Sequence, residues 1–179
     1  MTQQNPPRPL VPSRLPAHHQ DGNGASRQAG GAKNLWVRTG HLWKLNIGTY
    51  NVRSLRTDDR LMELDTELDN VKWDVVGISE VRRKGTELMT LKSGNLFYHS
   101  GSNVSQAGVG FMVNKALAGN VIEFKGISDR ICLVAIRLNE KCQVNIIQVY
   151  APTSSYDDEV VENFYSQVST TIEMCKGNN

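Results

Sequence analysis

The feature that most constrains the fold is a strand–helix–strand pattern between residues 44 and 80. "KLNIGTY" alternates apolar and polar residues with the period of a strand, and "DDRLMELDTELDNVKW" repeats apolar residues at helical spacing, up to Val71. "DVVGISE" is a nearly continuous apolar run, which is typical of a strand buried on both faces. Two strands joined by a helix run parallel in one sheet. We therefore expect Asn51 and Glu80, at the ends of the two strands, to lie at the same sheet edge.

The rest of the ordered part is rich in strand signals and ends in a helix. Branched and aromatic residues with intervening turn residues predict strands in "NLFYHSG", "GVGFMV", "NVIEFKGIS", "RICLVAIRL" and "QVNIIQVYAP". The last two predict a hairpin across "NEK". The segment "DDEVVENFYSQVSTTIEMCKG" predicts a helix, and its expected apolar face comprises Val160, Val161, Phe164, Val168, Ile172 and Cys175.

The first 43 residues differ from the rest in composition and charge. Residues 1–45 carry six basic side chains against one acid, so their charge of +5 leaves −3 for the remainder of a chain whose net charge is +2. The segment is rich in Pro, Gly, Gln and Ser and has no hydrophobic period, so we expect a disordered tail over residues 1–43 and one domain over residues 44–179. Such a basic arm either attracts nucleic acid nonspecifically or is an ordinary solvated leader.

The same composition excludes several classes of protein. No apolar run reaches the length of a membrane span, and prolines interrupt the first twenty residues where a secretory signal needs a continuous apolar stretch. The three cysteines form no CxxC pair, which argues against a disulfide framework or a zinc site. We expect an intracellular or nuclear protein with reduced thiols, no membrane contact and no disulfide-linked partner.

Three predicted strands deliver polar side chains at their carboxyl ends, namely Asn51, Glu80 and Tyr150. A carboxylate directly after five apolar residues is costly to bury unless it meets a cation or strong donors. Magnesium suits such a position, because it takes one or two carboxylates and completes its shell with water and phosphate oxygens. The alternative is that Glu80 emerges into solvent and pairs with Arg82 or Arg83, and spacing alone favours that alternative.

Five pieces of the sequence, in this order, resemble the endonuclease/exonuclease/phosphatase superfamily of magnesium-dependent phosphodiesterases. They are "GTYNVRSL", "VVGISEVRRKG", "GVGFMV", "RICLVAIRL" and "VYAPT". The pattern is most similar to the apurinic-type endonuclease domain of RTE-class non-LTR retrotransposons and to sequences derived from it. The resemblance covers residues 44–179. It implies an α+β fold of the DNase I-like type, in which two packed β-sheets are flanked by helices.

The resemblance also implies roles for individual residues. Asn51 matches the asparagine beside the metal and the scissile phosphate, and Glu80 matches the glutamate that coordinates Mg²⁺ or Mn²⁺. Tyr150 matches the tyrosine that supports the phosphate, and Arg130 matches the arginine that opens the "RI" strand near bound substrate. Thr153 stands where repair-type members often carry asparagine, and it is the expected phosphate contact there.

Two basic clusters follow the strands that end at Asn51 and Glu80. Arg53 and Arg56 come from "RSLR", and Arg82, Arg83 and Lys84 come from "VRRKG". We interpret them as a path for the DNA backbone, with solvated loop charges as the alternative.

The sequence also departs from the complete family pattern. Full members continue into a "GDFN" segment, which orients the attacking water, and an "SDH" segment, which supplies an acid/base pair; neither string occurs in these 179 residues. Because losing a general acid or base costs about 10²- to 10⁴-fold in rate, we expect this chain alone to be inactive or nearly so. We also expect a second sheet short of strands, with open edges and exposed apolar surface. A noncatalytic fragment that binds nucleic acid or protein, and a phosphatase of the same superfamily, are the alternative functions.

Overall fold

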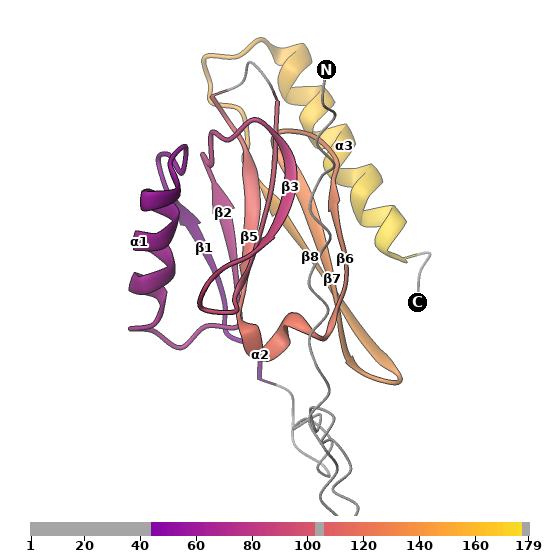
Figure 1. Cartoon of the computed structure of the whole chain (residues 1–179). Helices are drawn as coiled ribbons and strands as arrows, with labels where there is room; N and C mark the ends of the chain where they lie inside the picture. Colours follow the sequence, from indigo (N-terminus) through magenta and orange to yellow (C-terminus); the bar gives the residue numbers. More distant parts are fainter. Residues whose placement is uncertain (1–43, 103–105, 177–179) are drawn as a thin grey trace, which may run out of the picture. The chain divides into compact units, whose positions relative to one another are not determined.

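A computed structural model of the chain describes residues 44–102 and 106–176, all of which belong to one structural unit. The expected tail, residues 1–43, lies outside the described residues. The described part contains a five-stranded sheet, ordered β1-β2-β5-β4-β3, and a three-stranded sheet, ordered β6-β7-β8 (Figure 1). The strands are β1 (Ile47–Asn51), β2 (Val75–Ser79), β3 (Gly85–Thr90), β4 (Leu96–Gly101), β5 (Val109–Val113), β6 (Val121–Gly126), β7 (Ile131–Asn139) and β8 (Cys142–Val149).

The predicted strand–helix–strand unit is confirmed. β1 and β2 pair in parallel, with Asn51 opposite Ser79, and α1 (Asp58–Leu68) connects them. The Thr57 side chain caps the start of α1 by accepting a hydrogen bond from the Arg60 amide, which satisfies one free N–H of the first turn. The expectation for Val71 is wrong: the helix ends at Leu68, so Val71 lies beyond it and stays 58% exposed.

The two sheets pack against each other, which confirms the expected two-sheet α+β sandwich. The core between the sheets contains Val75, Tyr98, Val109, Phe111, Val113, Cys132, Val134 and Ile136. A second core lies on the other face of the five-stranded sheet, where Leu61 and Leu64 of α1 pack with Ile78, Phe97 and Met112. β5 faces both cores, because side chains along a strand alternate between its two faces.

The long helix α3 (Asp158–Lys176) runs alongside the three-stranded sheet in Figure 1. Phe164 and Thr171 are its buried residues, whereas Val160 and Ile172 are 40% and 42% exposed. The prediction that Val160 and Ile172 belong to the buried face is therefore wrong. The apolar pattern predicts the wrong buried face for α3, because the polar residue Thr171 occupies one of the buried positions.

Two elements are not predicted by the sequence patterns. The short helix α2 (Lys115–Ala118) begins at Asn114, whose side chain accepts from the Ala116 amide. β3 is not predicted, because this edge strand is almost wholly exposed and therefore has no apolar pattern. The predicted hairpin between β7 and β8 is confirmed by their antiparallel pairing.

Both sheets have an open edge that carries exposed apolar side chains. β1 is the outermost strand of the larger sheet and β8 that of the smaller one, and Ile47 and Val149 are 51% and 40% exposed. Near these edges the sheets approach closely, since a Cβ atom on Gly77 would clash with Oε1 of Gln148. Glycine at position 77 thus makes room for a buried glutamine between the sheets. No helix among the described residues is long and apolar enough to cross a membrane.

Candidate metal and phosphate site

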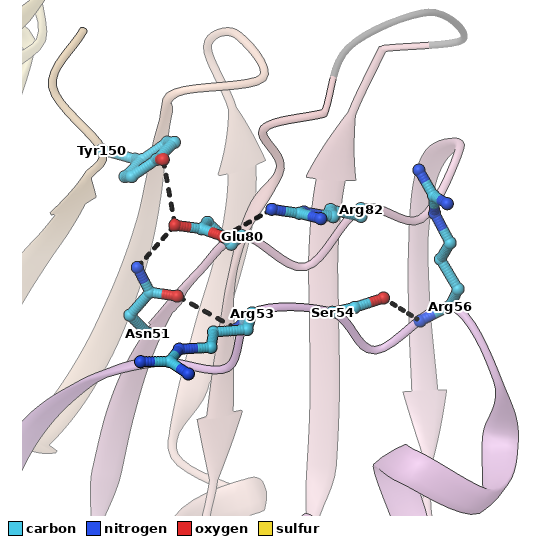
Figure 2. A network of polar contacts seen from close by, with 7 residues as sticks. All are labelled: Asn51, Arg53, Ser54, Arg56, Glu80, Arg82 and Tyr150. Atoms are coloured by element: carbon cyan, nitrogen blue, oxygen red, sulfur yellow. Dashed lines mark hydrogen bonds and ion pairs between the residues drawn. The ribbon is translucent and has the colours of Figure 1, made fainter. Parts of the chain in front are cut away.

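The candidate site lies where β1, β2 and β8 end. Asn51 is the last residue of β1, Glu80 directly follows β2, and Tyr150 directly follows β8. The parallel pairing of β1 with β2 brings the first two together, and the packing of the smaller sheet brings Tyr150 to the same place. The structure therefore places the three residues predicted for catalysis side by side (Figure 2).

Glu80 is the centre of this arrangement. Its Oε1 accepts hydrogen bonds from Nδ2 of Asn51 at 2.7 Å and from the Tyr150 hydroxyl at 3.1 Å. Its Oε2 forms an ion pair with Nη2 of Arg82 at 2.7 Å. The Glu80 side chain is only 15% exposed, so these three donors replace most of the water that a free carboxylate would bind. The expected pairing with Arg82 is confirmed, but Glu80 does not emerge into solvent, and its role as a magnesium ligand stays a prediction.

The surroundings of Glu80 fix the protonation states in the site. The hydrogen bond from Asn51 lowers the pKa of Glu80 against the opposing effect of burial, and Tyr150 and Arg82 lower it further. Burial raises the pKa of Tyr150, and its hydrogen bond to Glu80 raises it again. At neutral pH the carboxyl is therefore ionised and the phenol carries its proton, so the phenol donates and the carboxylate accepts.

The backbone around the site is held in an unusual conformation. Arg53, Glu80 and Arg82 have φ angles of 55°, 58° and 56°, in the left-handed region that residues with a Cβ atom seldom occupy. Each such residue costs on the order of 1 kcal/mol, and such residues cluster at functional sites. Hydrogen bonds hold the turns in place: the Arg53 amide donates to Oδ1 of Asn51, and the Arg82 amide donates to the Ala107 carbonyl.

Arg130 supports the site from the smaller sheet. Its guanidinium lies over the rings of Tyr150 and Tyr156, with its central carbon 5.3 Å and 4.9 Å from the two ring centroids. It also donates to the Tyr150 carbonyl at 3.2 Å and to the Tyr156 hydroxyl at 3.0 Å. The resemblance predicts that Arg130 contacts substrate, and this stays a prediction. In the structure Arg130 holds Tyr150 through a hydrogen bond to its carbonyl and a cation–π contact with its ring. Tyr156 is not predicted, because a single aromatic residue in a loop carries no periodic signal.

The side chains of the remaining predicted residues make no hydrogen bond to Glu80 among the described residues. The side chain of Arg53 is exposed, and Thr153 bonds its neighbour Ser155 through the two hydroxyls at 2.9 Å. Arg83 is bound away from Glu80: its Nε donates to the Leu55 carbonyl at 2.6 Å and its Nη2 pairs with Asp58 at 2.8 Å. Arg83 thus ties the loop after β1 to the segment after β2.

Fold and site together define a two-sheet α+β sandwich with a carboxylate-centred polar site at the ends of its strands. The chain matches no protein-family model. It is similar to craniofacial development protein 2 from Bos taurus and from Tragulus javanicus, with 29% identity to each over 129 residues. The aligned region covers 72% of this chain and 21% and 22% of those proteins. The chain thus spans about a fifth of the length of the curated relatives it matches.

Proposed function

We propose that residues 44–176 form the metal- and phosphate-binding part of an endonuclease/exonuclease/phosphatase-like domain that acts on the phosphodiester backbone of DNA. The observation that carries this proposal is the Glu80 carboxylate, held ionised by Asn51 and Tyr150 where three strands end. Similarity to craniofacial development protein 2 over 129 residues supports it.

The donor set fits a single magnesium or manganese ion. Oε1 of Glu80 already accepts two hydrogen bonds, whereas Oε2 accepts one, so a lone pair of Oε2 remains for a cation. The described residues contain no cluster of three or more metal-ligating side chains. Magnesium commonly binds through one carboxylate with water and phosphate oxygens in the other positions, which matches this arrangement.

Each residue then has a definable task. When bound, the metal would neutralise charge that develops on the phosphate oxygens. Asn51 and Tyr150 orient the Glu80 carboxylate and keep it ionised, and Arg130 holds Tyr150 in place. The neighbouring arginines attract the polyanionic substrate.

The described residues offer no acid/base pair for this reaction next to Glu80. Their single histidine, His99, lies on β4, and it pairs with no aspartate. We therefore propose that the 179 residues bind the metal and the backbone but do not by themselves hydrolyse it at an appreciable rate.

Metal binding is the direct test. We expect the chain to bind one Mn²⁺ ion weakly, measured as a decrease of the free-ion EPR signal, and we expect Glu80→Gln to abolish this binding. Glu140→Gln, at an exposed position in the β7–β8 turn, is the matched control and should bind like the parent chain. Equal Mn²⁺ binding by the Glu80→Gln variant and the parent chain would refute the assignment.

A second candidate function follows from the Arg82–Glu80 ion pair. Since Arg82 already neutralises the carboxylate at 2.7 Å, the fold can bind nucleic acid as a noncatalytic module without any metal. The Mn²⁺ measurement separates the two functions: saturable binding that depends on Glu80 favours the phosphodiesterase, and its absence favours the binding module.

A further inference from the structure

A basic pocket lies next to the candidate metal site, and the function proposed above assigns no ligand to the pocket itself. Its volume is about 380 Å³, and its lining residues are Arg56, Arg82, Arg83, Lys84, Glu87 and His99. They come from the loop after β1, the segment after β2, and the paired strands β3 and β4. We call it the basic pocket.

The charge of the basic pocket is not balanced by its own residues. Four of its lining side chains are cationic and one, Glu87, is acidic. Arg82 and Arg83 each have a carboxylate partner outside the lining, but within the described residues Arg56 and Lys84 form no ion pair. Both are exposed, and Figure 2 shows Arg56 well apart from Glu80, with Arg82 between them. Two cations without a carboxylate partner at one pocket favour an anionic ligand.

Two buried nitrogens in the lining point to the same conclusion. Nδ1 of His99 and Nε of Arg82 are buried and have no hydrogen-bond partner among the described residues. His99 is 1% exposed, and its Nε2 lies 3.8 Å from Oε2 of Glu87. A buried polar group without a partner costs about 1–3 kcal/mol, so such groups call for an explanation. Both atoms are closed to solvent in this conformation, so phosphate oxygens would accept from Arg82 Nε–H and from an N–H at His99 Nδ1 only after these side chains move toward the pocket.

The ionisation of His99 is consistent with an anion site. Burial and the nearby Arg83 guanidinium lower the pKa of His99, against the opposing effects of Glu87 and the Gly85 backbone. At neutral pH the imidazole is therefore uncharged, and it would bind a phosphate through a single N–H and not through charge.

Arg82 connects the basic pocket to the metal site. Its Nη2 holds Oε2 of Glu80, while its Nε is one of the two unpartnered nitrogens of the pocket. A single guanidinium therefore borders both sites, so two phosphates bound there would be close neighbours. Successive phosphates of one DNA strand advance by only about 3.4 Å along the helix axis.

From these observations we propose that the basic pocket is a second phosphate subsite, which holds a backbone phosphate of the DNA strand whose neighbouring phosphate lies at Glu80. The proposal rests on the function proposed above for its choice of DNA. It assigns ligand contacts to Arg56, Lys84 and His99, and it makes a phosphodiester chain, rather than a single phosphate group, the preferred ligand.

The test uses a fluorescein-labelled DNA duplex and fluorescence anisotropy in EDTA, so that metal binding does not contribute. We expect the double variant Arg56→Gln/Lys84→Gln to bind at least tenfold more weakly at low salt. The plot of the logarithm of the binding constant against the logarithm of the salt concentration has a negative slope. The magnitude of this slope should decrease by about 0.9 for each phosphate that the variant no longer neutralises. The control Lys92→Gln/Lys141→Gln removes the same charge from exposed positions outside the pocket lining and should change neither quantity appreciably.

A second measurement reports on His99 directly. In ¹⁵N NMR spectra the ring nitrogens of His99 should shift when the unlabelled duplex is added, and this shift should disappear in Arg56→Gln/Lys84→Gln. An unchanged His99 signal, or a double variant that binds DNA like its control, overturns the subsite. Displacement of the duplex by inorganic phosphate at equal phosphate concentration would also overturn it, because the pocket would then be a site for free phosphate.

The two proposals fail in distinguishable ways. The loss of Mn²⁺ binding in Glu80→Gln reports on the metal site, and the loss of DNA affinity in the pocket variant in EDTA reports on the basic pocket. A lower DNA affinity of the pocket variant without Mn²⁺ binding to the parent chain supports the subsite and refutes the metal site. Mn²⁺ binding without an effect of the pocket variant does the reverse.

Discussion

Replacing Tyr150 with phenylalanine tests whether the hydrogen bond between the sheets stabilises the ionised form of Glu80. The substitution removes one hydroxyl, which donates to Oε1 of Glu80 at 3.1 Å. A hydrogen bond to a charged group contributes about 1.5–3 kcal/mol. Because this bond is the longest of the three to Glu80, the lower end applies. We expect Tyr150→Phe to reduce the free energy of unfolding by about 1.5 kcal/mol at pH 7.

The pH dependence of this destabilisation has a definite sign. The pKa of Glu80 in the folded chain is lowered, so its carboxylate contributes stability above its unfolded-state pKa of about 4.3. That contribution disappears as the pH falls through the folded-state pKa, because the protonated carboxyl gains less from a donor. The destabilisation by Tyr150→Phe should therefore be complete at pH 7 and should shrink as the pH is lowered below about 4.3.

Urea unfolding followed by circular dichroism at a series of pH values measures both effects. Tyr165→Phe makes the same atomic change on a ring of α3 that is 59% exposed, and it should alter stability by less than about 0.5 kcal/mol. A double-mutant cycle with Glu80→Gln isolates the pair, whose coupling should exceed about 0.5 kcal/mol. The reasoning is refuted when Tyr150→Phe costs no more than Tyr165→Phe at pH 7, or when its cost does not change with pH.

Three further predictions follow from the strained turns, the core and the missing acid/base groups. At position 53 φ is 55°, so Arg53→Gly should be more stable than Arg53→Ala by about 1 kcal/mol in urea unfolding. At position 56, which has no positive φ, the alanine variant should be the more stable of the two. The same order of stability at both positions would contradict backbone strain at Arg53. Phe111→Ala, in the core between the sheets, should lower the free energy of unfolding by about 3–5 kcal/mol in the same assay. Leu88→Ala, on the exposed strand β3, should lower it by less than about 0.5 kcal/mol. Similar losses in the two variants would contradict the packing described. Supercoiled plasmid incubated with the chain and Mg²⁺ should stay intact; robust nicking that disappears in Glu80→Ala would show that these 179 residues suffice for catalysis.

Much of the fold was predictable because its strong signals are local. The apolar run before Glu80 reflects a strand that is buried on both faces. The helical spacing of Leu61 and Leu64 reflects a helix that is buried on one face. β3 was not predictable in this way: as an exposed edge strand it owes its place to pairing with β4, and its side chains record no burial. The true buried face of α3 was hidden for a related reason, since Thr171 takes a buried position by donating its hydroxyl to the Gln167 carbonyl.

The part of the site that was predictable from the sequence is the part that depends only on the directions of the strands. Parallel pairing requires Asn51 and Glu80 to meet, and this needs only the order of the elements. The partners of Arg83 and Arg130 depend instead on side-chain geometry, which no spacing encodes: one ties two loops together and the other stacks on two tyrosines. The sequence around His99 indicates only a structural or surface residue on a strand. Its burial beside unpaired cations depends on the pairing of β4 with β3.

The candidate site depends on the tertiary structure more than on any single element. Asn51 and Glu80 belong to the larger sheet, but Tyr150 reaches Glu80 from the smaller one, across 70 residues of sequence. Arg130 holds Tyr150 from the start of β7, whose residues Cys132 and Val134 pack against Phe111 in the core between the sheets. The position of the Tyr150 hydroxyl is therefore determined by how the sheets pack. A substitution that loosens the core at Phe111 should consequently weaken the Tyr150–Glu80 hydrogen bond, because Tyr150 packs against that core.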